Sequence, residues 1–437
     1  MPTAIEFFKL LPKTNCKDCG QPTCLAFAML LSNQKAKIED CPHVAQEAKE
    51  TLAEASAPPV KTIDVCGIKM GGETVLYRHE RRFNNPIAYA LTISDKLDPA
   101  GIADRVRYVE SLAFDRVGMI FKADMVCVRN DSKDAGIFAD AVKNVCAAWK
   151  GPLAIESDDA DAVKAALDAA DRRPLIYGAD DGRLDAYVDI AKSKKCPLAL
   201  ICDGPEGAVT MVERCEKAGF QDIILDLGCQ NLKEVIEEQT IVRRAAIKKK
   251  FKPFAYPMMN RVGYGEYAVA TAVMSTLKYG SLVIFDDLKS YEALPLFTLR
   301  QNIYTDPQVP IQVKQDLYPI GNPDEHSPIM FTTNFSLTYF TVRADIEKSK
   351  VPVWLQIVNT EGLSVLTAYS AGKFEPERIA DAFAESGVLS KSDGPVIIPG
   401  LVTRISGKLQ ELIGRKVIVG TNESRDIPKH LRELGSQ

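Results

Sequence analysis

The stretch Cys16-Lys17-Asp18-Cys19-Gly20-Gln21-Pro22-Thr23-Cys24, followed after sixteen residues by Cys41-Pro42, decides how the first part of the chain folds. Four of the eleven cysteines lie in this region, and the other seven are scattered singly as far as Cys229. Close-set thiolates on a loop that contains Gly and Pro can converge on one point, and four thiolates are the ligand set of an iron–sulfur cluster or of a structural zinc ion. The spacing therefore predicts a metal site built from Cys16, Cys19, Cys24 and Cys41.

The spacing favours a four-iron four-sulfur (4Fe-4S) cluster over zinc. Zinc sites usually show two matched C-x2-C pairs, whereas this chain has one such pair, a third cysteine five residues later and a distant fourth. The Pro that follows Cys41 is typical of cluster loops, because Pro lacks an N–H and keeps the chain off the inorganic core. Structural zinc, a disulfide pair and free thiols stay open as alternatives, although nothing else indicates the oxidising compartment in which disulfides persist.

Composition limits the class of protein. A chain of 437 residues predicts several domains, and contents of 46% hydrophobic and 26% charged residues are typical of a soluble globular protein. A net charge of −4 gives no electrostatic footprint for nucleic acid. No apolar run is long enough to span a bilayer, and the N-terminus lacks the basic and apolar regions of a signal peptide. We therefore expect a cytoplasmic protein that neither binds nucleic acid nor inserts into a membrane.

Local patterns predict a small helical module followed by a hairpin. The Ala/Ser/Pro-rich residues 55–59 are typical of a linker, and the alternating residues 60–65 and 73–77 around Gly71-Gly72 predict two antiparallel strands. The expected helices of the module are residues 5–11, 24–31 and 42–53.

Between about residues 85 and 300, short apolar strands alternate with amphipathic helices, which is the pattern of a parallel β/α architecture. Eight strands at near-regular spacing predict a (β/α)8 barrel of TIM type. The expected strands are Ile87–Ile93, Met125–Arg129, Leu153–Glu156, Leu175–Tyr177, Leu198–Ile201, Asp222–Leu225, Phe254–Pro257 and Ser281–Phe285. The expected helices are Asp134–Trp149, Asp159–Ala169, Arg183–Ala191, Gly207–Ala218, Asn231–Ala245 and Glu266–Leu277.

Chemistry in such a barrel is expected at the carboxyl ends of the strands. Polar residues stand there, for example Asn130-Asp131, Glu156-Ser157-Asp158 and Asp286-Asp287. They could bind a polar ligand or a cation, but each alone is equally suited to cap the helix that follows. The motifs of zinc proteases, P-loop proteins and serine hydrolases are absent, so the barrel shows no catalytic constellation.

After a connection at Thr298–Ile320, the pattern predicts a small doubly wound α/β domain. Such domains bind ligands beyond the carboxyl ends of their strands, where Gly362, Gly372, Gly400 and Gly420 would let the backbone approach a large ligand. No G-x-G-x-x-G follows a strand, which disfavours a nicotinamide dinucleotide. The expected strands are Ile329–Arg343, Pro352–Val358, Leu363–Tyr369, Val396–Ile398 and Lys416–Val419, and the expected helices are Phe374–Ser386 and Leu401–Ile413.

Several segments carry a resemblance that covers essentially the whole chain. They are Thr14–Phe27 around the cysteines, Val75–His79, Ile303–Pro307, Phe331–Tyr339 and Val396–Leu401. Together they resemble the large (gamma) subunit of the corrinoid iron–sulfur protein of the acetyl-CoA synthase/decarbonylase (CO dehydrogenase) system. The resemblance implies three domains: a 4Fe-4S cluster domain at residues 1–58, the TIM-type barrel at 59–320 and a corrinoid-binding α/β domain at 321–437.

The resemblance implies a corrinoid methyl carrier, one subunit of a methyltransferase system. A pterin methyltransferase would move a methyl group from a methyl-tetrahydropterin to Co(I), and the carrier would deliver it to acetyl-CoA synthase/CO dehydrogenase. The cluster would return oxidised cobalt to Co(I) with an electron from a low-potential donor. A homologous small (delta) subunit is the expected partner in a heterodimer.

Other functions stay open. The first alternative is an electron-transfer or reductive-activation protein without its own corrinoid, and the second is a zinc-stabilised structural subunit. For the barrel, a scaffold that docks a partner is favoured over a pterin methyltransferase, because its polar strand ends offer no assignable proton donor.

The resemblance also implies a base-off corrinoid with no protein ligand to cobalt. The nearest match to the D-x-H-x-x-G motif of other cobalamin proteins is Asp324–Ile329, which lacks the Gly and precedes a strand, so we expect His326 in a surface loop. Residues 363–367 are expected to cover the lower face of the corrin. The implied corrinoid contacts are Thr333, Tyr339, Gly362, Leu363, Ser364, Val365, Leu366, Thr367, Gly400, Gly420 and Ile427.

Overall fold

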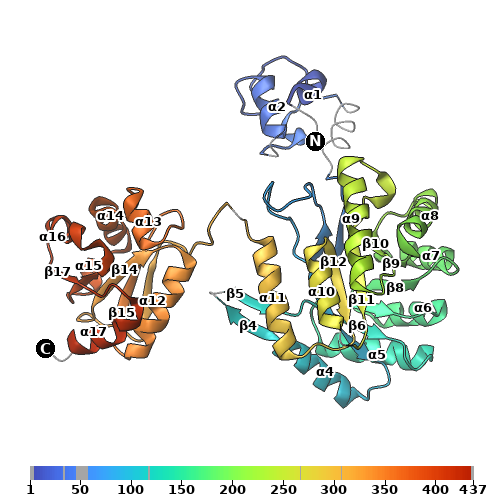
Figure 1. The fold of residues 1–437 in the computed structure, drawn as a ribbon. Helices are drawn as coiled ribbons and strands as arrows, with labels where there is room; N and C mark the ends of the chain where they lie inside the picture. The colour runs from blue at the N-terminus through green and yellow to red at the C-terminus, as the bar shows by residue number, and fades with distance from the viewer. Residues whose placement is uncertain are drawn as a thin grey trace. The chain divides into compact units, whose positions relative to one another are not determined.

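The computed structural model describes residues 4–32, 35–45, 58–116, 119–265, 267–306 and 308–434. The chain divides into two compact units (Figure 1). Unit 1 contains Met1–Leu112 and Lys122–Tyr304, and unit 2 contains Ala113–Phe121 and Thr305–Gln437. Among the described helices, we find no span with the length and hydropathy that a membrane crossing needs.

The first part of unit 1 is a small helical module. It contains α1 (Ala4–Leu10), α2 (Cys24–Ser32) and the 3-10 helix η1 (Ile38–Asp40). Its core is a cluster of apolar side chains that includes Phe7, Phe27, Cys24 and Cys41. The predicted helix at 42–53 lies mostly outside the described residues.

The predicted hairpin exists, but its turn and second strand are wrong. Strands β1 (Thr62–Val65) and β2 (Ile68–Gly71) pair around Cys66-Gly67, not around Gly71-Gly72. The turn forms there because Gly67 takes a φ of +91° and donates its N–H to Oδ1 of Asp64 at 2.8 Å. The hairpin residues Ile63, Val65 and Met70 pack against the inward-facing side chains of the barrel described next.

Eight strands form the central body of unit 1. They are β3 (Ala88–Ser94), β6 (Met125–Arg129), β7 (Leu153–Glu156), β8 (Leu175–Ala179), β9 (Leu198–Ile201), β10 (Ile223–Asp226), β11 (Met258–Val262) and β12 (Gly280–Phe285). All pairs are parallel, and the sheet closes in the order β10-β11-β12-β3-β6-β7-β8-β9. The strands are almost entirely buried, because side chains fill the interior and helices cover the outside. The prediction of a TIM-type barrel is confirmed.

Helices follow the strands around the barrel, close to the predicted positions. They are α5 (Ala135–Ala148), α6 (Ala160–Ala169), α7 (Leu184–Lys194), α8 (Gly204–Lys217), α9 (Leu232–Lys248), α10 (Ala268–Leu277) and α11 (Ser290–Tyr304). Helix α11 occupies the beginning of what the sequence predicts as a connection.

Two parts of the barrel differ from the prediction. The strand expected at Phe254–Pro257 is wrong, because Pro253 and Pro257 offer no N–H to a sheet ladder; the segment begins with the 3-10 helix η2 (Lys252–Phe254), and the strand is β11. The barrel also contains α4 (Pro99–Ser111), which is not predicted. Strands β4 (Ala113–Arg116) and β5 (Met119–Lys122), which form a separate two-stranded sheet and belong largely to unit 2, are not predicted either. Pro99 at the first turn and Asp98 as N-cap are the signals that could have identified α4.

Unit 2 contains a five-stranded sheet with helices on both faces. Its strands are β13 (Leu317–Ile320), β14 (Ile329–Thr333), β15 (Val353–Val358), β16 (Val396–Ile398) and β17 (Val417–Val419), in the order β13-β15-β14-β16-β17. Only the edge strand β13 is antiparallel to its neighbour. Helices α12 (Ser336–Ser349) and α17 (Ile427–Leu434) pack on one face, and α14 (Pro376–Ser386) and α16 (Ser406–Ile413) pack on the other.

Three predicted elements of unit 2 are wrong. The long strand expected at Ile329–Arg343 stops at Thr333, and α12 begins three residues later. The strand expected at Leu363–Tyr369 is a loop followed by the short helix α13 (Val365–Ser370), and the helix expected at Leu401–Ile413 begins as a 3-10 helix, η3 (Gly400–Ile405). The first segment is rich in Thr, Tyr and Phe and the second contains Val, Thr and Tyr, and the β-propensity of these residues is overridden here by tertiary packing.

In the closed barrel, we expect substitution of Gly178 to cause a large loss of stability. A Cβ at this position would lie 1.8 Å from the carbonyl oxygen of Ser157, and its φ is +145°. We expect Gly178→Ala to reduce the free energy of unfolding by about 3 kcal/mol or more, because the backbone of β8 must shift. As a control, Gly219→Ala changes a residue with positive φ but no atom nearby, and it should cost about 1 kcal/mol. Equal losses in urea unfolding would contradict the crowding argument.

Candidate functional site

The four predicted metal ligands lie in the helical module of unit 1. Cys24 and Cys41 are 6% and 3% exposed and belong to its core, Cys19 packs against that core, and Cys16 is exposed. The loop that carries the first three turns sharply, with positive φ at Asn15, Lys17 and Gly20. Asn15 Oδ1 accepts a hydrogen bond from the backbone N–H of Cys24 at 2.8 Å and so fixes the start of α2.

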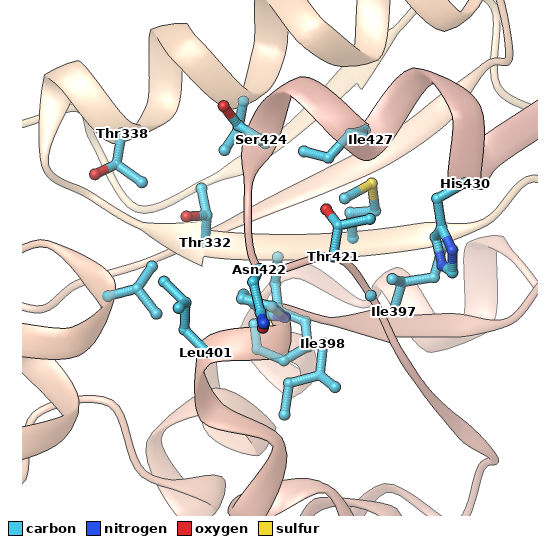
Figure 2. A pocket seen from close by; sticks show the side chains of 16 residues that line it. Thr332, Thr338, Ile397, Ile398, Leu401, Thr421, Asn422, Ser424, Ile427 and His430 are labelled. Carbon is cyan, nitrogen blue, oxygen red and sulfur yellow. The ribbon is translucent and has the colours of Figure 1, made fainter.

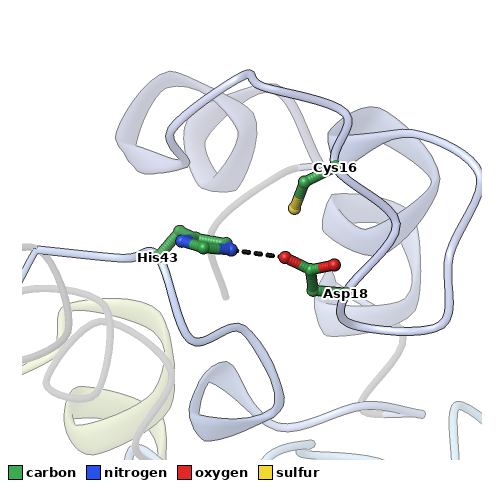
Figure 3. A group of neighbouring side chains, drawn as sticks. All are labelled: Cys16, Asp18 and His43. Carbon is green, nitrogen blue, oxygen red and sulfur yellow. Dashed lines mark hydrogen bonds and ion pairs between the residues drawn. The ribbon is translucent and has the colours of Figure 1, made fainter.

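Cys16 also has two polar neighbours that sequence reasoning missed. The ligand atoms of Cys16, Asp18 and His43 lie within 4.8 Å of one another (Figure 3). His43 Nε2 and Asp18 Oδ2 are 2.5 Å apart, and this contact lowers the pKa of Asp18 below its ordinary value. In the part of the chain that the structure describes, these three side chains are close enough together to bind one metal ion.

The donor chemistry of the module suits an iron–sulfur cluster. All four cysteines are free thiols, and three of them gather in or against one small core. A module of this size buries little apolar surface, so a metal centre would supply part of its stability. The residues present therefore fit the predicted group.

In unit 2, a pocket opens at the carboxyl ends of β14, β16 and β17 (Figure 2). The chain leaves β14 for β15 on one side and reaches β16 on the other, so the pocket lies at the point where the strand order reverses. Open α/β sheets bind ligands at such a point. The pocket wall is largely apolar and includes Met330, Phe331, Val342, Val365, Ile397, Ile398, Leu401 and Ile427.

Two buried polar atoms of this wall have no hydrogen-bond partner among the described residues: Oγ1 of Thr332 and Nε2 of His430. Thr332 is 1% exposed and lies on β14, whereas His430 lies on α17. Figure 2 shows them apart, with Thr421 between them in this view. A buried hydroxyl without a partner costs about 1–3 kcal/mol, so both atoms are positioned to gain from a polar ligand atom.

The glycines at the strand ends bring two loops of the chain together. A Cβ on Gly400 would lie 2.7 Å from the carbonyl oxygen of Gly420, and a Cβ on Gly420 would lie 2.9 Å from that of Ile398. The N–H of Gly400 donates to Thr421 O at 3.0 Å. These glycines therefore shape one edge of the pocket through contacts within the chain, in addition to any role in approaching a ligand.

The structure brings only some of the predicted corrinoid contacts to the pocket. Val365, Gly420 and Ile427 line it. Gly362, Leu363, Ser364, Leu366 and Thr367 lie in the loop after β15 and the first turn of α13, at the same carboxyl edge. Thr333 ends β14 and is fully buried.

Tyr339 and His326 lie away from the pocket wall. Tyr339 is on α12, is 3% exposed, and packs with Tyr318 and Phe340 in the cluster between helices and sheet. His326 is in an exposed turn before β14, where its side chain is 71% exposed and Nδ1 lies 2.8 Å from Asp393. That ion pair raises the pKa of His326 above its ordinary value. The prediction of a surface loop for His326 is confirmed.

Charged side chains at the carboxyl ends of the barrel strands form ion pairs with one another. Arg261 on β11 pairs with Glu156 on β7 at 3.1 Å and with Asp286 after β12. Arg129 on β6 also pairs with Asp286, at 2.5 Å. Burial raises the pKa of Glu156, and the Arg261 guanidinium opposes that rise. These carboxylates are therefore held in ion pairs at the carboxyl end of the barrel.

Two protein-family models and several known proteins match this chain. The protein-family model described as "CO dehydrogenase/acetyl-CoA synthase delta subunit" matches residues 65–431, and the one described as "Putative Fe-S cluster" matches residues 11–43. The corrinoid/iron-sulfur protein large subunit of Moorella thermoacetica is 41% identical, covering 97% of both chains. The acetyl-CoA decarbonylase/synthase complex subunit gamma of Methanocaldococcus jannaschii is 33% identical, covering 98% of this chain and 96% of that one. A solved dihydropteroate synthase from Thermus thermophilus is 12% identical with a TM-score of 0.39, covering 56% of this chain and 100% of that one.

The unpartnered hydroxyl in the pocket predicts a stabilising substitution. Thr332→Val replaces a buried hydroxyl that has no partner with a methyl group, so we expect the free energy of unfolding to rise by about 1 kcal/mol. Thr92→Val is the matched control, because Thr92 Oγ1 is also buried and unpartnered among the described residues but lies in the barrel. Urea unfolding measures both. A loss of stability in Thr332→Val would mean that its hydroxyl is satisfied in the folded chain.

Proposed function

Because this chain belongs to the family of corrinoid/iron–sulfur protein large subunits, the gamma subunits of acetyl-CoA decarbonylase/synthase complexes, we propose that it is a corrinoid methyl carrier. It would receive a methyl group from a methyl-tetrahydropterin through a methyltransferase and pass it to acetyl-CoA synthase. When bound, the corrinoid would supply the cobalt nucleophile, and the cluster would supply the electron that restores it. The observation that carries the proposal is the match to a corrinoid/iron-sulfur protein over 97% of both chains.

We assign the cluster to Cys16, Cys19, Cys24 and Cys41. The family match at residues 11–43 contains all four, and their placement in and around one small core supports the assignment. The domains proposed are residues 1–58 for the cluster, 59–320 for the barrel and 321–437 for the corrinoid.

We assign the corrinoid to the carboxyl edge of the unit 2 sheet. The pocket at the switch point is suited to the nucleotide end of the cofactor, because its wall is apolar and offers two unpartnered polar atoms, on Thr332 and His430. The proposed contacts to the rest of the cofactor are Thr333, Gly362, Leu363, Ser364, Val365, Leu366, Thr367, Gly400, Gly420 and Ile427. Tyr339 is left out because its ring is packed between α12 and the sheet.

We propose that no side chain ligates the cobalt. The exposed position of His326 and its ion pair with Asp393 support this, because His326 is the histidine in the closest match to a cobalt-ligating motif. Without a lower ligand, Co(I) is easier to reach, because that state is four-coordinate. A small subunit, a pterin methyltransferase, acetyl-CoA synthase/CO dehydrogenase and a low-potential electron donor are the proposed partners.

Metal content tests the proposal directly. Full-length protein prepared without oxygen should contain about four iron atoms and about one cobalt atom per chain, and a Co(I) absorption band should appear on reduction. Cys24→Ser should lose most of the iron, because it removes a buried ligand. Cys215→Ser, at a buried cysteine of the barrel, is the control and should keep it.

Other metal contents would point elsewhere. Iron without cobalt, even after addition of corrinoid and small subunit, would favour an electron-transfer or reductive-activation protein. Stoichiometric zinc in a colourless protein would favour a structural subunit.

The nucleotide pocket has its own test, which compares cobalamin with cobinamide, a corrinoid without the nucleotide. The full chain should bind cobalamin about tenfold more tightly, since cobinamide leaves the pocket empty. Thr332→Val and His430→Phe should each reduce this preference, whereas Thr92→Val should not. Equal affinity of the unaltered chain for both corrinoids would contradict the assignment of the nucleotide to this pocket.

A further inference from the structure

A single buried amide ties together three segments at the carboxyl edge of the unit 2 sheet. Asn334 directly follows β14 and is 3% exposed. Its Oδ1 accepts hydrogen bonds from the backbone N–H of Thr360 at 2.9 Å, from the hydroxyl of Thr360 at 3.0 Å and from the backbone N–H of Gly362 at 2.9 Å. Its Nδ2 donates to Gln312 Oε1 at 3.0 Å and to Asn359 Oδ1 at 3.1 Å.

These bonds determine the path of the loop after β15. Glu361 and Gly362 both have positive φ, which costs free energy for Glu361, and the amide of Asn334 supports the turn from inside. The turn is also crowded, because a Cβ on Gly362 would lie 2.9 Å from side-chain atoms of Pro310 and of Gln312. The loop therefore has little freedom while Asn334 is in place.

Main-chain bonds at Asn334 and Ser336 hold the segment that leads into the sheet. Asn334 O accepts from Val313 N at 2.9 Å, and Ser336 N donates to Ile311 O at 3.0 Å. Residues 311–313 are thus held by these main-chain bonds and by the bond from Asn334 Nδ2 to Gln312, whereas the side-chain oxygen of Asn334 holds residues 360–362. An amide is needed here, because the site requires both an acceptor and a double donor.

The loop continues without a break into residues 363–367. The backbone N–H of Leu363 donates to Thr360 O at 3.3 Å, and the hydroxyl of Ser364, directly before α13, lies 3.1 Å from that of Thr367. A displacement at Thr360 or Gly362 therefore moves the start of α13. Leu366 in its first turn is 50% exposed, an apolar side chain presented to solvent.

We propose that Asn334 is a positioning residue, which holds residues 359–363 and thereby sets the position of residues 363–367 against the lower face of a bound corrinoid. The inference rests on the proposed function. In this role Asn334 does not touch the cofactor; it keeps residues 363–367 in place, and these residues exclude water from the cobalt. Water at a lower face with no protein ligand would stabilise Co(II) relative to Co(I), because Co(I) is four-coordinate.

Substitution of Asn334 tests this role in the full chain loaded with cobalamin. Asn334→Asp keeps the acceptor and loses the double donor, and Asn334→Ala loses both. Each should shift the Co(II)/Co(I) midpoint potential to a more negative value and accelerate cobalamin release about tenfold. Gln312→Ala, which removes one partner and keeps Asn334, should give a smaller shift in the same direction and covers the case in which an Asn334 variant does not fold.

The matched control is Asn260→Asp, which changes another buried amide that is hydrogen-bonded to Gln239 in the barrel. It should lower stability without changing the potential. If the Asn334 and Gln312 variants lose stability as Asn260→Asp does but keep the native potential and release rate, Asn334 only holds the fold. If the unaltered chain binds no corrinoid at all, the proposed function fails and this inference fails with it.

Discussion

The reversal of strand order at β14 is the constraint on which the rest of unit 2 depends. Strands β14 and β16 are neighbours, but their outgoing connections run to opposite sides, to β15 and to β17, and this leaves a crevice between their carboxyl ends. The pocket lies there, between the ends of β14 and β16. Asn334, directly after β14, then decides where the neighbouring loop runs. The binding edge is thus set by topology first and by one buried amide second.

The barrel of unit 1 uses its carboxyl end differently. Arg261 and Arg129 neutralise Glu156 and Asp286 there, and the hydroxyl of Tyr177 donates to the buried Asp226 at 2.7 Å. Acids that are paired in this way are poor candidates for proton transfer, because the neighbouring guanidinium groups favour their charged form. This supports a scaffold role for the barrel, with chemistry confined to the two cofactors proposed elsewhere in the chain.

How much could be predicted from the sequence depended on how local each signal is. Barrel strands such as Met125–Arg129 are buried on both faces and are readable as short apolar runs. The cysteine spacing is local too. In contrast, Phe331–Tyr339 has the composition of a strand, but β14 ends at Thr333 and α12 begins at Ser336. Thr332 and His430 are almost one hundred residues apart, and only the fold brings them to one pocket.

Unsatisfied polar atoms do not mark a binding site by themselves. In the barrel, the described side chains of Gln239, Arg243 and Ser275 also include buried atoms without partners. What distinguishes Thr332 and His430 is that their unpartnered atoms line an apolar pocket at the switch point of a parallel sheet. The position of these two atoms in the pocket, and not their lack of a partner alone, is what supports a ligand there.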